Sequence, residues 1–407
     1  MKFQRRKILS LAAAGAATSC IPSLVLSQTA NTFRIGVLNP ITGAGSPYGT
    51  GMQKAIQLAV EEVNAAGGAA GRKLEAFYED DQTQPQAGVL AAKKLIEINK
   101  IEALIGTWAS GVTLAVMPLT DEANIIEMNV SGAPAISTLD KKDLVWRFQA
   151  TNDRFGAAFA EIAKKRGFKR PATMAFNNAS GRGNTDGFKR VWESRGGKVV
   201  SEVVYEPNRP SYRSELQKVL AEKPDVIVMG SYLPDTTIIL REWYQSGDKV
   251  SWIIPAWAAN PELIKAVGPE VAEGLISVDT VSNETAPSYK PLNERFQKAA
   301  GSPLSGNIYA AMCYDMVISL ALAIELAGAK ATPQQVSSHM RDVSNSPGTA
   351  VASFAQGKQL IARKQKINYE GASSKLDFDA SGDAKSDFGV YVIEGGKLVR
   401  RDTISVE

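Results

Sequence analysis

The sequence predicts an α/β protein of two lobes, each built from a parallel sheet flanked by helices. Short β-branched and apolar runs alternate with segments of helical periodicity, a pattern typical of parallel sheets covered by helices on both faces. These runs are too numerous for one compact sheet in a chain of 407 residues, so we expect two domains of ordinary size.

The first half of the chain contains three strand–helix pairs. FRIGVL precedes GTGMQKAIQLAVEEVNAAGG, KLEAFYED precedes PQAGVLAAKKLIEIN, and IEALIGT precedes SGVTLAVMPLTDEA. An apolar segment then ends near Arg147, and a new helical pattern begins near Asn152. We expect the seam between the lobes at this point.

The second half repeats the alternation with four more predicted strands. They are PATMAFNN, KVVSEVVYE, DVIVMGSYL and VSWIIPAW, and helical patterns separate them. A long apolar helix over 307–328 has no strand partner of its own. The tail from 375 to 407 indicates turns and hairpins, with Gly395 and Gly396 as a hairpin turn.

Residues 1–27 have the layout of a secretory signal peptide: a basic start, an apolar stretch and small residues up to Ser27. The Arg5–Arg6 pair suits the twin-arginine route, whereas the basic start alone suits the general route, so both stay open. Cys20 lacks the leucine three places earlier that a lipoprotein signal favours, which makes lipid anchoring the minority interpretation. We expect a soluble periplasmic product and no later membrane-spanning stretch.

The charge balance argues against polyanionic partners. The whole chain has 46 basic and 42 acidic residues, but four basic and no acidic residues lie in 1–27, which leaves 42 of each. Binding to nucleic acid or to an anionic membrane therefore has no compositional support. Only Cys313 remains after cleavage at Ser27, so an internal disulfide is excluded.

The residues needed for catalysis, metal binding or cofactor binding are largely missing. His339 is the one histidine, which excludes histidine-cluster metal sites, and Cys313 lies in the apolar helix. The glycines of GAGSPYG (43–49) are spaced one residue too far apart for a dinucleotide fingerprint. DFDASGD (377–383) resembles the start of a calcium loop but has Phe388 at the twelfth position. We expect no enzyme, no metal and no cofactor.

The most informative stretch is the uncharged junction GTWASGVTLAVMPL (106–119). A helix that begins at Ser110 offers free N–H groups to a carboxylate or another polar oxygen. Ser110 and Thr113 add hydroxyl donors, and Trp108 adds a flat apolar wall. The alternative is that Ser110 is only an N-cap and Trp108 only a core residue.

Similar junctions recur at other predicted strand ends. They carry aromatic or small polar residues, namely Tyr48, Ser131, Gly132, Ala133, Ser180, Tyr232 and Trp257. Ligands of open α/β sheets bind beyond the carboxyl ends of the strands. The pattern therefore predicts a cleft that grips a small molecule without transforming it.

The chain resembles the periplasmic leucine/isoleucine/valine-type (type I) substrate-binding proteins of ABC importers. Four segments carry the resemblance: FRIGVLNPITGAGSPYGTGMQKAIQLAVEEVNAAGG, GRKLEAFYEDDQTQPQAGVLAAKKLI, IEALIGTWASGVTLAV and DFGVYVIEGGKLV. It implies two lobes that close over the ligand about a hinge of three crossovers. We expect residues 32–149 plus 280–348 in the first lobe and 150–279 plus 349–407 in the second.

The resemblance also implies site residues. It places Ala109, Ser110 and Thr113 on the ligand's carboxylate, Ser131 to Ala133 as backbone donors, and Ser180 and Tyr232 on the second lobe. The family's acidic partner for the amino group falls on Ala256. Asp235 is a neighbouring substitute, although a helix-capping role suits it better.

This departure leaves the ligand class open. A branched-chain or other amino acid, an aromatic or apolar carboxylate, and an amide all remain. The resemblance further implies delivery to a permease in the inner membrane, and we expect a monomer. The alternative function is an exported ligand sensor with the same fold.

Overall fold

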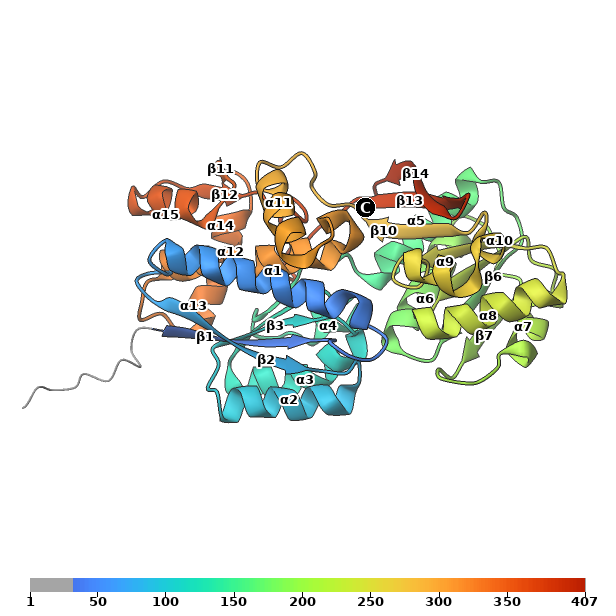
Figure 1. Cartoon of the computed structure of the whole chain (residues 1–407), viewed down its shortest axis with the longest axis horizontal. Coiled ribbons are helices and arrows are strands. Elements are labelled where there is room, and N and C mark those ends of the chain that lie inside the picture. Colours follow the sequence, from blue (N-terminus) through green and yellow to red (C-terminus); the bar gives the residue numbers. More distant parts are fainter. Residues whose placement is uncertain (1–31, 407) are drawn as a thin grey trace, which may run out of the picture.

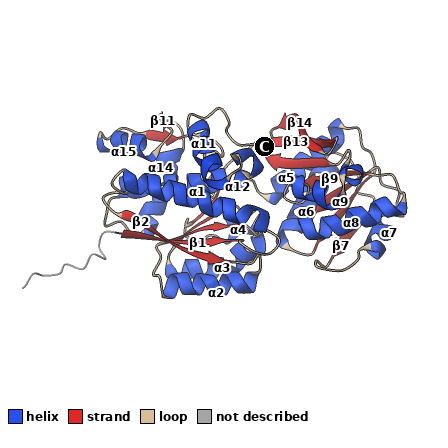
Figure 2. Ribbon diagram, in the orientation of Figure 1, coloured by secondary structure: helices blue, strands red, loops and turns tan. Residues whose placement is uncertain are grey.

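The computed structural model describes residues 32–406, so the predicted signal peptide and Cys20 lie outside the described residues. The described chain folds into two lobes side by side, each with its own main sheet (Figures 1 and 2). This arrangement confirms the predicted α/β architecture.

The first lobe is built on a five-stranded parallel sheet in the order β2-β1-β3-β4-β5. Its strands are β1 (Thr32–Asn39), β2 (Lys73–Asp80), β3 (Ala103–Thr107), β4 (Ile126–Asn129) and β5 (Val145–Arg147). The interleaved helices are α1 (Ser46–Ala65), α2 (Pro85–Glu97), α3 (Ser110–Ala123) and α4 (Ala135–Leu139). Every residue of β3 is buried, as expected for a central strand covered on both faces.

The second lobe is built on a seven-stranded sheet in the order β14-β13-β10-β9-β8-β6-β7. Its strands are β6 (Pro171–Phe176), β7 (Glu202–Tyr205), β8 (Val226–Gly230), β9 (Ser251–Pro255), β10 (Ile276–Thr280), β13 (Phe388–Glu394) and β14 (Lys397–Ile404). Its helices are α5 (Asn152–Lys165), α6 (Ala179–Ser194), α7 (Arg213–Leu220), α8 (Leu233–Ser246), α9 (Pro261–Val267) and α10 (Pro269–Ala272). Strands β13 and β14 form the predicted hairpin, and Gly395 and Gly396 turn it with positive φ angles of 55° and 74°.

The remaining elements pack against the first lobe. They are α11 (Tyr289–Ala300), η2 (Leu304–Gly306), α12 (Ile308–Ala327), α13 (Pro333–Ser338), α14 (Met340–Ser344), β11 (Thr349–Val351), α15 (Phe354–Ala362) and β12 (Ile367–Tyr369). Helix α15 contacts α1 and α12, and Figure 1 shows β11 and β12 beside them. Residues 349–369 thus lie with the first lobe, whereas the sequence placed them in the second.

Helix α12 corrects the expectation that no later stretch is able to span a bilayer. Ile308–Ala327 has the length and hydropathy of a membrane span, but 83% of the relevant window is buried inside the protein. An all-round apolar helix that is buried in this way serves as the central core helix of a lobe.

Three crossovers connect the lobes, as the family resemblance implied. They run from β5 to α5 (148–151), from β10 to α11 (281–288), and from β12 to β13 (370–387). The buried Asp315 carboxylate of α12 accepts a hydrogen bond from Tyr369 Oη (2.7 Å) at the end of β12. It also accepts one from Ser373 N (2.7 Å) in the third crossover. This carboxylate anchors the crossover to the first lobe.

Candidate ligand-binding site

The junction after β3 is held in place by its neighbours. Gly106 has a φ of +99°, and a Cβ there would lie 2.4 Å from Asn39 Nδ2, so the position requires glycine. Asn39 Nδ2 donates to the Gly106 carbonyl at 3.1 Å and ties the end of β1 to that of β3. The chain then turns at Trp108, and α3 begins at Ser110, as the sequence predicts.

A small cavity lies between the lobes at this junction, and we call it the cleft cavity. Its lining comes from both lobes and the crossovers: Trp108, Ser110, Val130, Gly132, Gln149, Asn152, Ser180, Tyr232, Trp257 and Tyr309. Its volume is only about 20 Å³. The lobes are therefore closed on each other, with side chains filling most of the cleft.

Aromatic rings form the walls of the cleft cavity. The rings of Trp108 and Tyr232, from opposite lobes, lie 5.1 Å apart between centroids. Tyr309 meets Trp108 edge-on at 6.0 Å and Tyr48 at 5.0 Å. Burial raises the pKa of Tyr232 to about 12, although hydrogen bonding to Asn178 and Ser180 lowers it, so its hydroxyl stays neutral.

The start of α3 supplies uncommitted donors. The N–H groups of Val112 and Thr113 both donate to the Ala109 carbonyl, at 2.9 and 3.1 Å. Those of Ser110 and Gly111 have no acceptor among the described residues. Ser110 Oγ accepts from the Ala133 N–H at 3.1 Å, which leaves its own proton free to donate.

Two predicted site residues support this junction from behind instead of lining the cleft cavity. Thr113 Oγ1 and Ser131 Oγ lie 2.5 Å apart, and both side chains are fully buried. Thr113 also bonds Thr107 Oγ1 (2.9 Å), and Ser131 bonds the Trp108 carbonyl (3.0 Å). These hydroxyls are occupied within the first lobe.

Ala109 and Ala133 flank the lining residues, and Tyr48 stacks on Trp108 at 5.7 Å between ring centroids. Tyr48 also reaches the other lobe, because Asn260 Nδ2 donates to its hydroxyl at 2.9 Å. Asn260 Oδ1 meanwhile accepts from the Leu263 N–H at 3.0 Å and caps α9. This is a direct hydrogen bond between the lobes.

Close packing makes Gly132 a required glycine. A Cβ there would lie 1.5 Å from Asn152 Oδ1. Asn152 cannot easily turn away, because its Nδ2 donates to the Ser180 carbonyl (2.6 Å) and to Ser180 Oγ (2.8 Å). Gly132, Asn152 and Ser180 thus form one interlocked side of the cleft cavity.

Arg147, the last residue of β5, holds the loop that contains Gly132 and Ala133 in place. Its buried guanidinium donates from Nη1 to the Ala133 carbonyl at 2.9 Å and pairs through Nε with Asp383 Oδ1 at 2.8 Å. Asp379 Oδ1 accepts from the Ser381 and Asp383 N–H groups, so DFDASGD is a turn as expected. The third crossover therefore touches the ligand loop through Arg147.

Within residues 32–406, no carboxylate, lysine or arginine lines the cleft cavity. Asp235 lies in the first turn of α8 without a side-chain capping bond, and Oδ1 accepts from Tyr212 Oη (2.6 Å) and the Asn208 N–H (3.0 Å). Asp279 on β10 lies outside the lining and accepts from the Thr280 N–H at 2.9 Å. Asp279 is half-buried, and desolvation raises the pKa of its carboxyl group to about 8.

Four lining residues escaped the sequence analysis: Val130, Gln149, Asn152 and Tyr309. Gln149 and Asn152 follow β5, which is a strand end like the others. Tyr309 lies in the first turn of a helix with no strand before it, so no junction pattern marks it.

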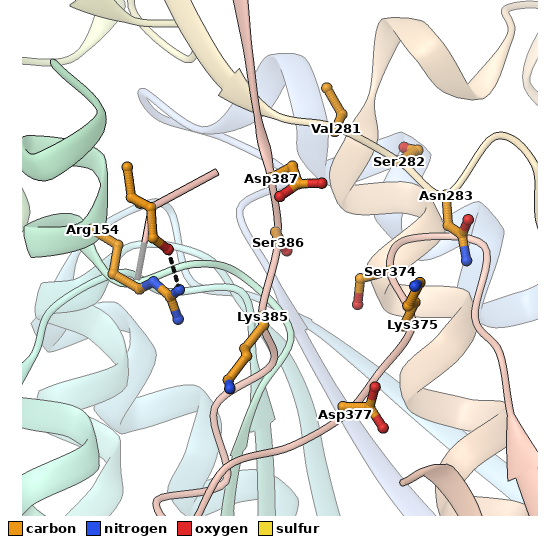
Figure 3. Close-up of a pocket in the computed structure, with 11 residues that line it drawn as sticks. Arg154, Val281, Ser282, Asn283, Ser374, Lys375, Asp377, Lys385, Ser386 and Asp387 are labelled. Carbon is orange, nitrogen blue, oxygen red and sulfur yellow. Dashed lines mark hydrogen bonds between the residues drawn. The ribbon is translucent and has the colours of Figure 1, made fainter. Parts of the chain in front are cut away.

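A larger hollow of about 700 Å³ lies elsewhere, among the second and third crossovers (Figure 3). Its charged lining residues have both signs: Arg154, Lys375, Asp377, Lys385 and Asp387. Both lysines and Asp387 are exposed, and the Arg154 guanidinium donates to the Val406 carbonyl. Within the described part of the chain, two aliphatic residues and no aromatic residue line this hollow, in contrast to the aromatic walls of the cleft cavity.

Cys313 and His339, the side chains considered for catalysis or metal binding, do not line the cleft cavity. Cys313 is fully buried in α12, and burial raises the pKa of its thiol far above its usual range. His339 Nδ1 contacts Asp342 Oδ2 at 2.8 Å beside α14. Among residues 32–406, no three metal-ligating side chains gather.

Residues 32–365 match the family model described as periplasmic binding protein. The chain belongs to this family. Its members bind small molecules and work with ABC transporter permeases, which places this solute-binding protein among exported periplasmic components.

Relatives match over nearly the whole length. The leucine-, isoleucine-, valine-, threonine- and alanine-binding protein of Pseudomonas aeruginosa is 25% identical, over 90% of this chain and 91% of the relative. A Leu/Ile/Val-binding protein of Rhizobium johnstonii is 24% identical, over 93% and 96%. The crystal structure of a leucine-binding protein from Thermotoga maritima has a TM-score of 0.79 at 24% identity, over 92% and 99%.

Proposed function

We propose that this chain captures an aromatic or apolar carboxylate in the cleft cavity and delivers it to the permease of an ABC importer in the inner membrane. One observation carries the ligand class: among the described residues, the lining of the cleft cavity combines aromatic walls and free N–H and hydroxyl donors with no acidic side chain. The first turn of α3 suits a carboxylate. An α-ammonium group would be buried without a counter-charge, at a high cost in free energy.

The ligands bound in similar solved structures belong to both classes. Rhodopseudomonas palustris proteins of this fold were solved with benzoate and with 4-hydroxybenzoate, at 21% and 18% identity. Others were solved with isoleucine or leucine. The fold thus accommodates both classes, and the lining residues favour the first.

Calorimetry of the mature protein with benzoate, 4-hydroxybenzoate and L-leucine tests the proposal. We expect an aromatic anion to bind and L-leucine to bind more weakly or not at all. Tighter binding of L-leucine than of either anion would refute the ligand class.

Asp279 supports a second candidate, an amino acid ligand. Burial raises the pKa of the Tyr48 and Tyr309 hydroxyls, and the negative charge of Asp279 raises both further. A bound ammonium would favour the ionised form of Asp279 and gain a counter-charge. In this case Asp279→Asn would abolish L-leucine binding, whereas our proposal predicts no effect on benzoate binding.

We also propose a soluble monomer with its mature N-terminus close to residue 28, which binds its ligand without turnover. Mass spectrometry of the exported protein tests the N-terminus, and a lipid-modified Cys20 would contradict it. Light scattering tests the monomer, and recovery of unchanged ligand tests the absence of turnover. Deletion of the gene should abolish uptake of the ligand; intact uptake with a lost transcriptional response would indicate a sensor.

A further inference from the structure

Gln149 has a buried donor that no residue of the described chain satisfies. The side chain is only 2% exposed and lines the cleft cavity. Its Nε2 atom, with two N–H donors, has no hydrogen-bond partner within residues 32–406. An unpaired buried donor is costly, and this one lies at a cavity where an oxygen of a ligand can accept from it.

The orientation of this amide is fixed by its other end. Gln149 Oε1 accepts from the Ala150 N–H at 3.0 Å and from Thr280 Oγ1 at 3.0 Å. A backbone N–H only donates, so the atom facing Ala150 must be the oxygen. Nε2 is therefore on the side of the amide that faces away from Ala150 N and Thr280 Oγ1.

Gln149 lies at the hinge end of the cleft. It belongs to the first crossover, and Thr280 is the last residue of β10, where the second crossover begins. Burial raises the pKa of the Tyr309 hydroxyl well above its usual value, and nearby Gln149 lowers it slightly, but Nε2 does not reach hydrogen-bond geometry with this hydroxyl. The free donors of Ser110 and Gly111 belong to a different element, the start of α3.

We propose that Gln149 selects ligands that carry a second hydrogen-bond acceptor besides the carboxylate. The inference rests on the proposed function, in which the start of α3 takes the carboxylate. Gln149 Nε2 then donates to an oxygen on the ligand's body, and the favoured substrate class is an aromatic carboxylate with a hydroxyl or keto substituent. A ligand without this oxygen leaves the buried donor unpaired, which lowers its affinity.

Calorimetry with benzoate, 3-hydroxybenzoate and 4-hydroxybenzoate tests this inference. The wild-type protein should bind at least one hydroxybenzoate about tenfold to a hundredfold more tightly than benzoate. Gln149→Met, which keeps the length but has no donor, should lose this preference, because it loses more affinity for the hydroxybenzoate than for benzoate. The matched control is Asn184→Leu, because Asn184 is also a buried amide without side-chain partners but lies outside the cleft cavity. It should keep the preference.

The outcomes separate this inference from the proposed function. Wild-type protein that binds benzoate as tightly as both hydroxybenzoates overturns the inference alone. An equal loss of all three anions in Gln149→Met does so too, because Gln149 would then act on the carboxylate or on the fold. A wild-type protein that binds none of the anions overturns both. If Gln149→Met does not fold, Thr280→Val keeps the amide but removes one orienting bond, and the preference should still shrink.

Discussion

Replacing Tyr48 by phenylalanine removes the acceptor of the hydrogen bond between the lobes and is expected to weaken ligand binding. The ring still packs on Trp108 and Tyr309. Asn260 is 8% exposed, and its capping bond to Leu263 fixes its rotamer, so Nδ2 is left unpaired whenever the lobes close. A lost bond plus an unpaired buried donor costs about 1–3 kcal/mol of the closed state.

This cost appears in the apparent affinity because the closed form encloses the ligand. A closed state that is less populated raises the apparent Kd in proportion, here about fivefold to a hundredfold. Calorimetry with the benzoate derivative that binds wild-type protein most tightly measures the change. Small-angle scattering of the ligand-free protein should show a larger radius of gyration for Tyr48→Phe.

The matched control is Tyr244→Phe, because Tyr244 is 48% exposed and lies on α8 of the second lobe. It should bind like the wild type. Wild-type affinity of a folded Tyr48→Phe variant, with an unchanged radius of gyration, would refute the idea that this bond stabilises closure.

Three further outcomes are expected. Ser110→Ala should weaken binding of the carboxylate by about 0.5–3 kcal/mol in calorimetry, and Trp108→Ala by more; unchanged affinities would refute the site. Asp383→Ala leaves buried Arg147 unpaired and should cost about 3–5 kcal/mol in urea unfolding, whereas a loss below 1 kcal/mol would contradict its supporting role. Burial raises the pKa of Glu127 from 4.5 to about 8, so the fold favours its protonated form. The free energy of unfolding should therefore fall by about 3 kcal/mol between pH 4.5 and 7. Glu127→Gln should abolish this part of the pH dependence, and an unchanged pH dependence in the variant would contradict the assignment.

The rule that ligands bind beyond the carboxyl ends of parallel strands predicts a large part of the lining of the cleft cavity. Six residues of the uncharged junctions line it, namely Trp108, Ser110, Gly132, Ser180, Tyr232 and Trp257. This works because parallel strands present their carboxyl ends at one edge of each sheet, whatever the length of the helices between them.

The direction of individual side chains was beyond the sequence. Thr113 and Ser131 sit in the predicted segments, but their hydroxyls bond each other behind the loop. Which face of a turn a hydroxyl takes depends on local dihedral angles and on the neighbours it meets. Those neighbours are far away in sequence.

The sequence by itself determined the alternation of strands and helices, the two lobes, the terminal hairpin and the absence of a histidine-based site, because periodicity and composition are local properties. Only the tertiary structure decided that Gln149 and Tyr309 meet Trp108 in one cavity, that Asn260 bonds Tyr48, and that residues 349–369 pack on the first lobe. Each of these contacts joins segments separated by a crossover. The path of a crossover depends on how the two lobes close against each other, which no local pattern encodes.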